Sequence, residues 1–556
     1  MRAHFHHSIF FILIVFFSLI ACYKLFTPSF YTSHDGEGHV IRMIEYDEAW
    51  RDGQMPVRIA KRINYGLGYP FFNFNYPLPY FFGQVIHLAG FSFVTSFKLL
   101  FILSTIIAGL SMYLFMRTHV SRASSFISAL FYIFVPYRFL NMYVRGNPAE
   151  YLGLSLLPLL FFSIDRLVDT KGKKYGLFIF SGIVFFLSHN STALIGFLIA
   201  LCYFLIRLYH SSDQKRIGIY FVLSLAFIGC TTSFFWIPVV FETGLTKLSE
   251  LSEDYQFFFP SFRELLYSPW GFGAYKQGDM PGKMSPQIGL LHISVYIVSI
   301  FGFLLALWNK KIIWKKARIF IFFFSIVTIS MFFTLSVSKP LWDGIFLLRM
   351  VQLPWRFLGI IAFGSSVLVG CIVNAIHIHR SVFIFGYVIV IGMLLYVNRN
   401  HIRVNQYTEF QNPFDLHPIY GFSTTSKDEH MPRLAPRIHE DPNPDGDFFP
   451  LSAGISKRTV WKSNYQMFSV MADQPVEFRA NVSYFPGWNA FLDSKPVLLL
   501  YNKDEYQRLR IKVPEGVHII EFRFSEPWYR LIADSISLIA LVSLLGVCIV
   551  KKGKNI

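Results

Sequence analysis

The sequence has few charged residues for its length. Asp, Glu, Lys and Arg make up 15% of the 556 residues, whereas apolar residues make up 53%. A soluble protein of this length carries more charge. Many of the apolar residues form runs of about 20, which is the length that spans the hydrocarbon core of a bilayer. The composition therefore excludes a soluble globular protein and predicts a mainly α-helical, polytopic membrane protein.

Cysteine is scarce, and several familiar motifs are missing. The cysteines all lie within apolar segments, which excludes a disulfide framework and a Cys-based zinc site. The chain has no P-loop, no GxSxG elbow and no dinucleotide fingerprint, so nothing indicates an ATP-driven pump or a hydrolase of a soluble type. No metal motif has convincing spacing. Asp35, Glu37 and His39 could hold a hard divalent cation, although the sequence does not require one. The five cysteines are Cys22, Cys202, Cys230, Cys371 and Cys548.

Acidic residues are fewer than basic ones, and the formal net charge is +17. Nucleic acid is nevertheless excluded as a partner, because the positive charge lies in short loops between apolar runs, where it orients a protein in its membrane. We predict twelve spans, with the N-terminal run as an uncleaved anchor because no convincing small-residue cleavage site follows it. The spans lie near 8–26, 95–116, 122–138, 150–167, 175–188, 192–208, 217–239, 287–307, 317–336, 355–376, 381–397 and 529–550.

The loops between these spans indicate an orientation. With the N-terminus inside, every inner connector is short and basic, and the C-terminus also falls inside. The apolar stretch 77–90 is too short to span upright, so we interpret it as an interfacial or re-entrant helix of the first outward loop. The inner connectors carry Arg117 and Arg122; Arg166, Lys171, Lys173 and Lys174; Arg207, Lys215 and Arg216; Lys310, Lys311, Lys315, Lys316 and Arg318; and Arg380.

Three outward loops are long, at 27–94, 240–286 and 398–528. Residues 1–397 are expected to form the transmembrane domain, and 529–556 the last helix with a basic inner tail. The loop 398–528 is expected to be an outer domain. Its second part alternates polar and apolar residues over 476–482, 508–513 and 518–524, with turn signals between the runs. This pattern predicts a small antiparallel β-sandwich just before the last span.

Polar residues gather at the start of the first outward loop. If a helix begins near Asp35, then Asp35, His39 and Arg42 lie on one face of it, at positions i, i+4 and i+7. A carboxylate, an imidazole and a guanidinium on one face at a membrane surface favour an active site, with Glu37 beside them. The alternative is that Asp35 only caps the helix.

Basic residues are normally scarce in outward loops, yet the first loop contains Arg42 and Arg58 among others. Arg145 lies in the outward loop 139–149, Glu150 at the mouth of the next span, and Arg356 near the outer surface. Arginine binds phosphate with two parallel hydrogen bonds, which favours an anionic ligand. The alternative is pairing with lipid headgroups or with the acidic residues of the first loop, Glu45, Asp47, Glu48 and Asp52.

Two further residues are candidates for binding. His189 breaks the outer end of a span, where an ionisable group indicates function by default, although it could equally be a packed core residue. Tyr76 lies in an aromatic stretch that also contains Asn73 and Asn75, and it could bind sugar hydroxyls. Most tyrosines at this level instead belong to the interfacial aromatic belt.

Several stretches resemble one family, the multi-spanning bacterial membrane proteins related to 6-pyruvoyl-tetrahydropterin synthase, which overlap with the YfhO-like proteins. Both groups resemble GT-C glycosyltransferases, and the tetrahydropterin name does not imply pterin chemistry. The resembling stretches cover most of the membrane part. They are His34-Asp35-Gly36 with His39 and Arg42; residues 68–80; Pro136-Tyr137-Arg138 with Arg145-Gly146 and Ala149-Glu150; residues 268–273; and Gln352-Leu353-Pro354-Trp355-Arg356-Phe357.

The resemblance implies a glycosyltransferase of the bacterial inner membrane, acting at its outer face. Asp35 stands where GT-C enzymes place their catalytic Asp or Glu, and it would deprotonate or orient the acceptor hydroxyl. Arginines would stabilise the phosphate of a polyprenyl-phosphate sugar donor. The implied partners are membrane lipids, this donor, and a glycan or lipid acceptor. Asp35 is not followed by a second Asp, which departs from the pattern and leaves a metal requirement open.

Two other functions remain possible from the residues. The first is a non-enzymatic transporter or scaffold for lipid or polysaccharide, in which the arginines only guide an anionic lipid. A transferase needs the Asp35 carboxylate, whereas a scaffold can lose it. The second is a glycan-binding outer β-domain anchored by the membrane part, although twelve spans would be a large anchor.

Overall fold

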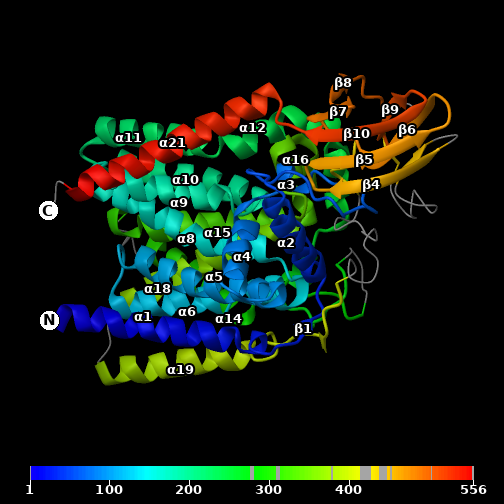
Figure 1. Ribbon diagram of the computed structural model, residues 1–556. Coiled ribbons are helices and arrows are strands. Elements are labelled where there is room, and N and C mark those ends of the chain that lie inside the picture. Colours follow the sequence, from blue (N-terminus) through cyan, green and yellow to red (C-terminus); the bar gives the residue numbers. More distant parts are fainter. Residues whose placement is uncertain are drawn as a thin grey trace. The chain divides into compact units, whose positions relative to one another are not determined.

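The computed structural model describes two compact units, each built from separated stretches of the chain (Figure 1). The first unit comprises Met1–Glu37, Gly90–Ile228 and Ser252–Glu409, and the second comprises Gly38–Ala89, Gly229–Leu251 and Phe410–Ile556. The residues described are 2–275, 281–308, 314–376, 380–412, 428–436, 448–450, 454–502 and 504–553.

The first unit is helical because its sequence consists mostly of long apolar runs, and its long helices lie side by side in Figure 1. Short helical turns connect them: η1 (Tyr23–Leu25), η4 (Lys247–Phe257, of which the first five residues belong to the second unit), η5 (Ser336–Ser338) and η6 (Pro354–Arg356). A two-stranded ribbon pairs β1 (Phe30–Tyr31) with β2 (Tyr407–Thr408). The helices are α1 (Arg2–Ala21), α5 (Phe93–Met116), α6 (Arg122–Ile133), α7 (Pro136–Phe139), η2 (Leu140–Arg145), α8 (Pro148–Asp169), α9 (Tyr175–Phe186), α10 (Asn190–Tyr209), α11 (Gln214–Thr231), α13 (Phe262–Leu266), α14 (Leu290–Trp308), α15 (Trp314–Thr334), α16 (Lys339–Gly344), α17 (Phe346–Arg349), α18 (Phe357–Ala375) and α19 (Arg380–Asn398).

Fewer helices meet a strict test of length and apolar composition for membrane spans than the sequence predicts. Among the described residues, five helices are long and apolar enough to cross a bilayer, namely α5, α8, α10, α15 and α18. The count rises to seven if each of two bent helix pairs forms one span. A helix or bent pair lies at each of the twelve predicted positions, but several of these helices are short. The structure thus establishes five to seven candidate spans, and twelve stays a prediction.

Aromatic residues fill the centre of the first unit. The ring of Phe161 lies 5.0 Å from that of Phe363 and 5.8 Å from that of Phe115, and Phe323 lies 5.2 Å from Phe363. These residues come from α5, α8, α15 and α18, so one aromatic cluster joins four helices. Small side chains let α5 and α8 approach closely, as where the Ser111 hydroxyl donates to the Ser155 carbonyl at 3.1 Å. Such contacts are typical of helix packing in membranes.

The chain bends between α6 and α8. Pro136 cannot continue the helical hydrogen bonds of α6, and the segment Pro136–Arg145 leaves α6 at 42°. It ends as a π-helix, η2, a form that often occurs at functional sites. Gly146 follows in a left-handed conformation (φ 65°), and α8 then begins with Asn147 as its N-cap. The bend places Arg145 and Glu150 close together.

The second unit contains a small two-sheet β-region near the C-terminus. All of its strand pairs are antiparallel, in the orders β4-β5-β10-β7-β8 and β3-β6-β9. Along β5, buried and more exposed residues alternate, as the period of a strand requires. Phe468, Phe478 and Phe522 from both sheets meet in one core, with ring distances of 5.1–6.4 Å. The strands are β3 (Phe448–Pro450), β4 (Ile455–Trp461), β5 (Tyr465–Ala472), β6 (Val476–Ser483), β7 (Trp488–Leu492), β8 (Lys495–Val497), β9 (Arg508–Val513) and β10 (Gly516–Phe524).

Helices complete the second unit, and a buried ionic network joins them. Arg530 at the start of α21 pairs with Glu242 at the end of α12 at 2.7 Å, and both side chains are fully buried. Asn73 of the first loop donates to the same Glu242 carboxylate at 2.5 Å. The helices are α2 (Gly36–Arg51, of which the first two residues belong to the first unit), α3 (Phe71–Phe74), α4 (Leu78–Leu88), α12 (Ser233–Glu242), η3 (Thr243–Leu245) and α21 (Trp528–Gly553).

The observed strands and helices fit the sequence patterns at several points. The alternating runs at 476–482, 508–513 and 518–524 fall on β6, β9 and β10, and the short apolar stretch 77–90 forms α4. Of the irregular part expected before residue 455, residues 413–427, 437–447 and 451–453 lie outside the described residues. The second unit joins the β-region, which lies in the third long loop, with parts of the first and second long loops. The predicted domain boundaries at 397 and 528 stay predictions.

Candidate functional site

The segment before α2 is fixed against the end of the π-helix in the first unit. The His34 and Asp35 backbone N–H groups donate to the carbonyls of Val144 and Arg145, at 3.0 and 2.8 Å. Asp35 directly precedes α2, as the sequence predicts. Its half-exposed carboxylate takes no hydrogen bond or ion pair in the described part of the chain. Asp35 is therefore held in place through its backbone, while its carboxylate remains available.

Two glycines make this close approach possible. A Cβ on Gly146 would lie 2.3 Å from the Ser33 hydroxyl oxygen and 3.0 Å from the Gly36 Cα, and the positive φ of Gly146 disfavours any other residue. A Cβ on Gly36 would likewise lie 2.3 Å from the Ser33 hydroxyl. The stretches around Asp35 and Arg145 thus pack backbone to backbone.

Glu150 is the centre of a buried charge cluster. It lies in the first turn of α8 and is only 1% exposed. One carboxylate oxygen accepts from the Arg145 guanidinium at 2.7 Å and lies 3.4 Å from the Arg356 Nε. The other accepts from the Tyr137 hydroxyl and lies 3.5 Å from the Asn141 amide. Hence one carboxylate sits between two guanidinium groups, and we call Arg145, Glu150 and Arg356 the ion triad.

Arg356 is held rigidly on its other side. Its guanidinium donates to the Val351 carbonyl at 2.6 Å and to the Ser191 hydroxyl at 2.8 Å. A third contact joins it to the Gln352 amide oxygen at 3.1 Å. The backbone of Gln352 is left-handed (φ 67°), which folds the chain back ahead of Arg356. The triad therefore joins α8, η2 and η6 at one end of the helices.

His189 is the N-cap residue of α10, and its Nδ1 accepts the Thr192 backbone N–H at 3.3 Å. Burial lowers the pKa of His189 to about 3, with the nearby Arg356 charge acting in the same direction. It is therefore neutral at physiological pH. This supports the interpretation of His189 as a packing and capping residue beside the triad, and it leaves the guanidinium groups as the cations there.

The triad carries one net positive charge, and Asp35 adds a negative charge beside it. The Asp35 carboxylate lies close enough to interact electrostatically with Arg145. The two charges need not form a contact pair, because Arg145 is already bonded to Glu150 and Asn141. Chemically, a half-exposed carboxylate next to a preorganised cation is suited to handling a hydroxyl and an anionic leaving group together.

The other predicted residues are placed separately. Glu37 is exposed in the first turn of α2. In the second unit, the Tyr80 hydroxyl contacts His39 Nδ1 at 3.1 Å and the Arg42 guanidinium at 3.5 Å, and Tyr76 stacks on the Tyr80 ring. His39, Arg42 and Tyr76 thus form a second group around Tyr80.

Arg58 has a different environment from the one expected of a phosphate ligand. It is 2% exposed, and it pairs with Asp534 at 2.8 Å and with Glu526 at 3.2 Å. A further bond runs to the Phe234 carbonyl at 2.8 Å. The alternative of pairing within the protein therefore fits Arg58 better. It also fits the neighbouring bases Lys61 and Arg62, which pair with Glu48, Asp52 and Glu45.

Some residues at the site carried no clear signal in the sequence. Asn141 and Ser191 contact the triad, yet each is an ordinary residue within an apolar helix or turn. Tyr137, which donates to Glu150, lies in one of the stretches that carry the family resemblance, but its role as a ligand of Glu150 had no signal. Asn73 and Asn75, considered for sugar binding, instead bond to Glu242 and His430. Among the described residues, no group of three or more His, Cys, Asp or Glu side chains is placed to hold a metal ion.

The helical first unit, its candidate spans and the buried triad define a polytopic membrane protein. A family model described as "6-pyruvoyl-tetrahydropterin synthase related domain; membrane protein" matches residues 72–403. The chain belongs to this family. The matched range includes Arg145, Glu150, His189 and Arg356, whereas Asp35 lies before it.

One curated relative is an uncharacterized protein of Lactococcus lactis subsp. cremoris (strain MG1363). It is 25% identical over 252 residues, which cover 43% of this chain and 41% of the relative. The matched part thus spans less than half of the relative's length.

Two solved structures of glycosyltransferases are similar over most of this chain. The arabinofuranosyltransferase AftD from Mycobacteria gives a TM-score of 0.44 at 12% identity, covering 73% of this chain and 28% of AftD. The oligosaccharyltransferase of Archaeoglobus fulgidus in its apo form gives 0.41 at 10% identity, covering 71% of this chain and 55% of that protein.

Proposed function

We propose that this protein is a membrane glycosyltransferase of GT-C type. It transfers a sugar from a polyprenyl-phosphate donor to a cell-envelope glycan or lipid acceptor. The observation that carries the proposal is the half-exposed Asp35 carboxylate beside the buried ion triad. The motifs that resemble GT-C-related families occur at the same places, around Asp35, Arg145, Glu150 and Arg356.

In the proposed reaction, Asp35 accepts the proton of the acceptor hydroxyl, and the acceptor oxygen forms a bond to the anomeric carbon of the sugar. The bond between this carbon and the phosphate oxygen breaks, and the polyprenyl phosphate leaves with the bonding electrons. Arg145 and Arg356 stabilise the negative charge on the leaving phosphate, because they are fixed before the reaction begins. Glu150 orients both guanidinium groups. Glu37, exposed on the first turn of α2, assists at the mouth of the site.

We further propose the membrane arrangement that this reaction needs. The chain crosses the bacterial inner membrane twelve times, with both termini in the cytoplasm and the β-region outside. The alternation of basic loops supports this orientation. The site end of α8 then faces outward, toward the leaflet where a flipped lipid-linked donor is presented.

The test is complementation of a deletion strain with Asp35→Asn. This change is isosteric and removes only the charge and the proton-accepting capacity. We expect normal protein abundance without restoration of the envelope glycan. Glu409→Gln is the matched control, because Glu409 is an exposed carboxylate of the same unit, next to β2. Glycan restored by Asp35→Asn at normal abundance would favour the alternative of a non-enzymatic transporter or scaffold.

A further inference from the structure

A cavity of about 1220 Å³ lies in the first unit, at the end of α8 opposite to Glu150. Glu150 occupies the first turn of α8, and Asp169, the last residue of α8, lines the cavity. At 1.5 Å per residue, these two positions are about 28 Å apart along the helix. The cavity is therefore separate from the proposed catalytic site, and it lies at the end where the connectors are rich in Lys and Arg.

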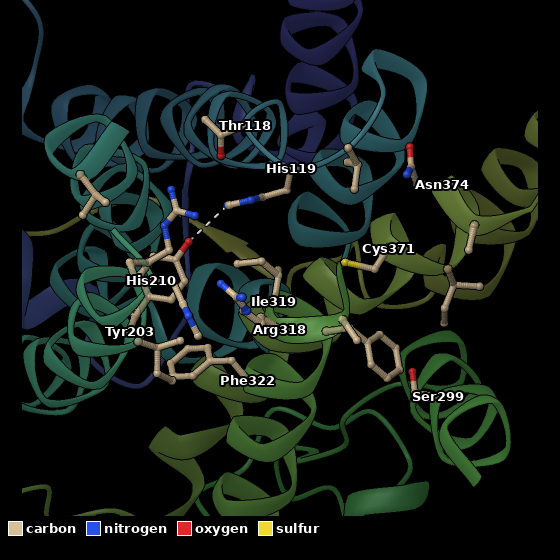
Figure 2. A pocket seen from close by; sticks show the side chains of 18 of the residues that line it. Thr118, His119, Tyr203, His210, Ser299, Arg318, Ile319, Phe322, Cys371 and Asn374 are labelled. Atoms are coloured by element: carbon tan, nitrogen blue, oxygen red, sulfur yellow. Dashed lines mark hydrogen bonds between the residues drawn. The ribbon is translucent and has the colours of Figure 1, made fainter. Parts of the chain in front are cut away.

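A buried carboxylate fixes one wall of this cavity. Asp165 is fully buried, and it accepts from His119 at 2.7 Å, Tyr203 at 2.7 Å and Thr118 at 2.8 Å. One Asp165 carboxylate oxygen also lies 2.9 Å from the Arg207 Nε. Figure 2 shows Thr118, His119 and Tyr203 at the edge of the cavity. Asp165 thus joins the ends of α5, α8 and α10, and it positions the basic side chains His119 and Arg207.

The lining of the cavity is positively charged. The lining contains three basic side chains that carry a full charge, those of Lys171, Arg207 and Arg318, and one carboxylate, that of Asp169. Arg207 pairs with Asp169 at 2.6 Å. Within the described residues, Lys171 and Arg318 have no hydrogen bond or ion pair from their side chains. Two unpaired cations at one cavity create a local positive potential that attracts an anion.

Part of the remaining lining is apolar and exposed. Val298 and Gly302 of α14 and Phe322 of α15 line the cavity. Val298 is 53% exposed, and Ile206 of α10, which also lines the cavity, is 38% exposed. In a membrane protein, exposed apolar residues on long helices contact lipid chains. The cavity therefore combines a cationic polar end with apolar walls that continue into the bilayer.

We propose that this cavity binds an anionic phospholipid of the leaflet at that end. The lipid phosphate lies between Lys171 and Arg318, and an acyl chain runs along Val298 and Phe322. Basic pockets between transmembrane helices recognise anionic headgroups in this way. A free phosphate ion would use the two cations but leave the apolar walls unfilled, so the cavity matches a lipid better than a soluble anion.

The first test compares lipid retention by the purified full-length protein, using native mass spectrometry. The probes are phosphatidylglycerol and, as the zwitterionic reference, phosphatidylcholine. We expect the double variant Lys171→Gln/Arg318→Gln to bind phosphatidylglycerol about 30-fold more weakly. Each basic residue near an anionic lipid strengthens binding about fivefold, and the variant removes two of them. Phosphatidylcholine binding should stay unchanged. The control is Lys173→Gln/Lys174→Gln, which removes two exposed charges from the same connector but none from the cavity.

The second test fills the cavity. A Cβ on Gly302 meets no atom within 4 Å, so Gly302→Phe can be accommodated, and its ring should displace the lipid. Gly218→Phe on α11 is the matched control, because Gly218 is equally open but lies outside the cavity. Equal retention of phosphatidylglycerol by wild type and both cavity variants would overturn the proposal. Competition by inorganic phosphate as strong as that by phosphatidylglycerol would overturn it in favour of a soluble anion.

Discussion

At the scale of residues, the buried charges decide how the site holds together. Glu150 separates two guanidinium groups that would otherwise repel each other in a medium of low dielectric constant. The two positive side chains and the negative one are stable there only together, because each has lost its hydration. Asp35 differs from them, since it is half-exposed and its carboxylate is not bonded within the described residues. The triad is thus the fixed part of the site and Asp35 the reactive part.

This assignment predicts a large effect of Glu150→Gln on stability. The change leaves Arg145 and Arg356 buried without their counter-charge, and removing one partner of a buried ion pair costs about 3–5 kcal/mol. Thermal unfolding of the purified protein in detergent measures the effect. Arg51→Gln is the control, because Arg51 is 66% exposed in its pair with Asp47, and such surface pairs contribute about 0–1 kcal/mol. Equal effects of the two changes would show that the triad is not a stabilising centre.

A second prediction at this scale concerns pH. Burial lowers the pKa of His430 to about 3, whereas an unfolded histidine titrates near 6.5. The unfolded state therefore binds the proton first as the pH falls, and stability present above pH 6.5 is lost between about pH 6.5 and 3. At pH 5 the free energy of unfolding is about 2 kcal/mol lower than at pH 7, because each pH unit below 6.5 costs about 1.4 kcal/mol.

The measurement is the unfolding temperature of wild type and of His430→Gln at pH 7 and pH 5. The variant lacks the titrating ring, so it should lose less stability than the wild type between these two values. The amide of Asn75, which contacts the His430 Nε2 at 2.6 Å, can bond to the new glutamine instead. An equal loss in both proteins would mean that His430 does not cause the acid sensitivity.

At the scale of elements, glycines decide whether the Asp35 segment can reach η2. We predict that Gly146→Ala lowers transferase activity strongly, since its Cβ would collide with Ser33 and the left-handed backbone would be strained. The additional change Ser33→Gly removes most of the colliding atoms and should restore part of the activity. Gly244→Ala, which meets no atom within 4 Å, is the control. Activity of Gly146→Ala equal to that of wild type would show that this packing does not position Asp35.

Local patterns in the sequence predicted many elements but not how they assemble. The alternating strands β6, β9 and β10 and the start of α2 beside Asp35 follow from periodicity and turn signals. The triad could be predicted only in part: Arg145 and Glu150 lie in adjacent segments, whereas Arg356 is distant in the chain and reaches Glu150 through the folded backbone of Gln352. The π-helix has no sequence signal of its own. The phosphate role of Arg58 stays a prediction. Its partners Glu526 and Asp534 could not be predicted from the first loop, because they come from the far end of the chain.

At the scale of the whole molecule, the proposed function depends on which side of the membrane the site end faces. The basic connectors predict an inside N-terminus and an outside β-region. Reporter fusions at residue 312 and residue 450 should therefore signal opposite compartments, with residue 450 outside. Fusions that report the same side would refute the twelve-span arrangement. The five to seven candidate spans would then stand, but the site end of α8 would have no assigned side of the membrane.

The central claim is that Asp35 beside the ion triad performs sugar transfer from a lipid-phosphate donor. The most direct measurement is mass spectrometry of lipid-linked sugars from a deletion strain that carries wild type, Asp35→Asn or an empty vector. We predict that the polyprenyl-phosphate sugar accumulates with the empty vector and with Asp35→Asn, and that wild type returns it to its normal level. A donor pool that does not change on deletion, or that Asp35→Asn lowers as fully as wild type does, would contradict the claim.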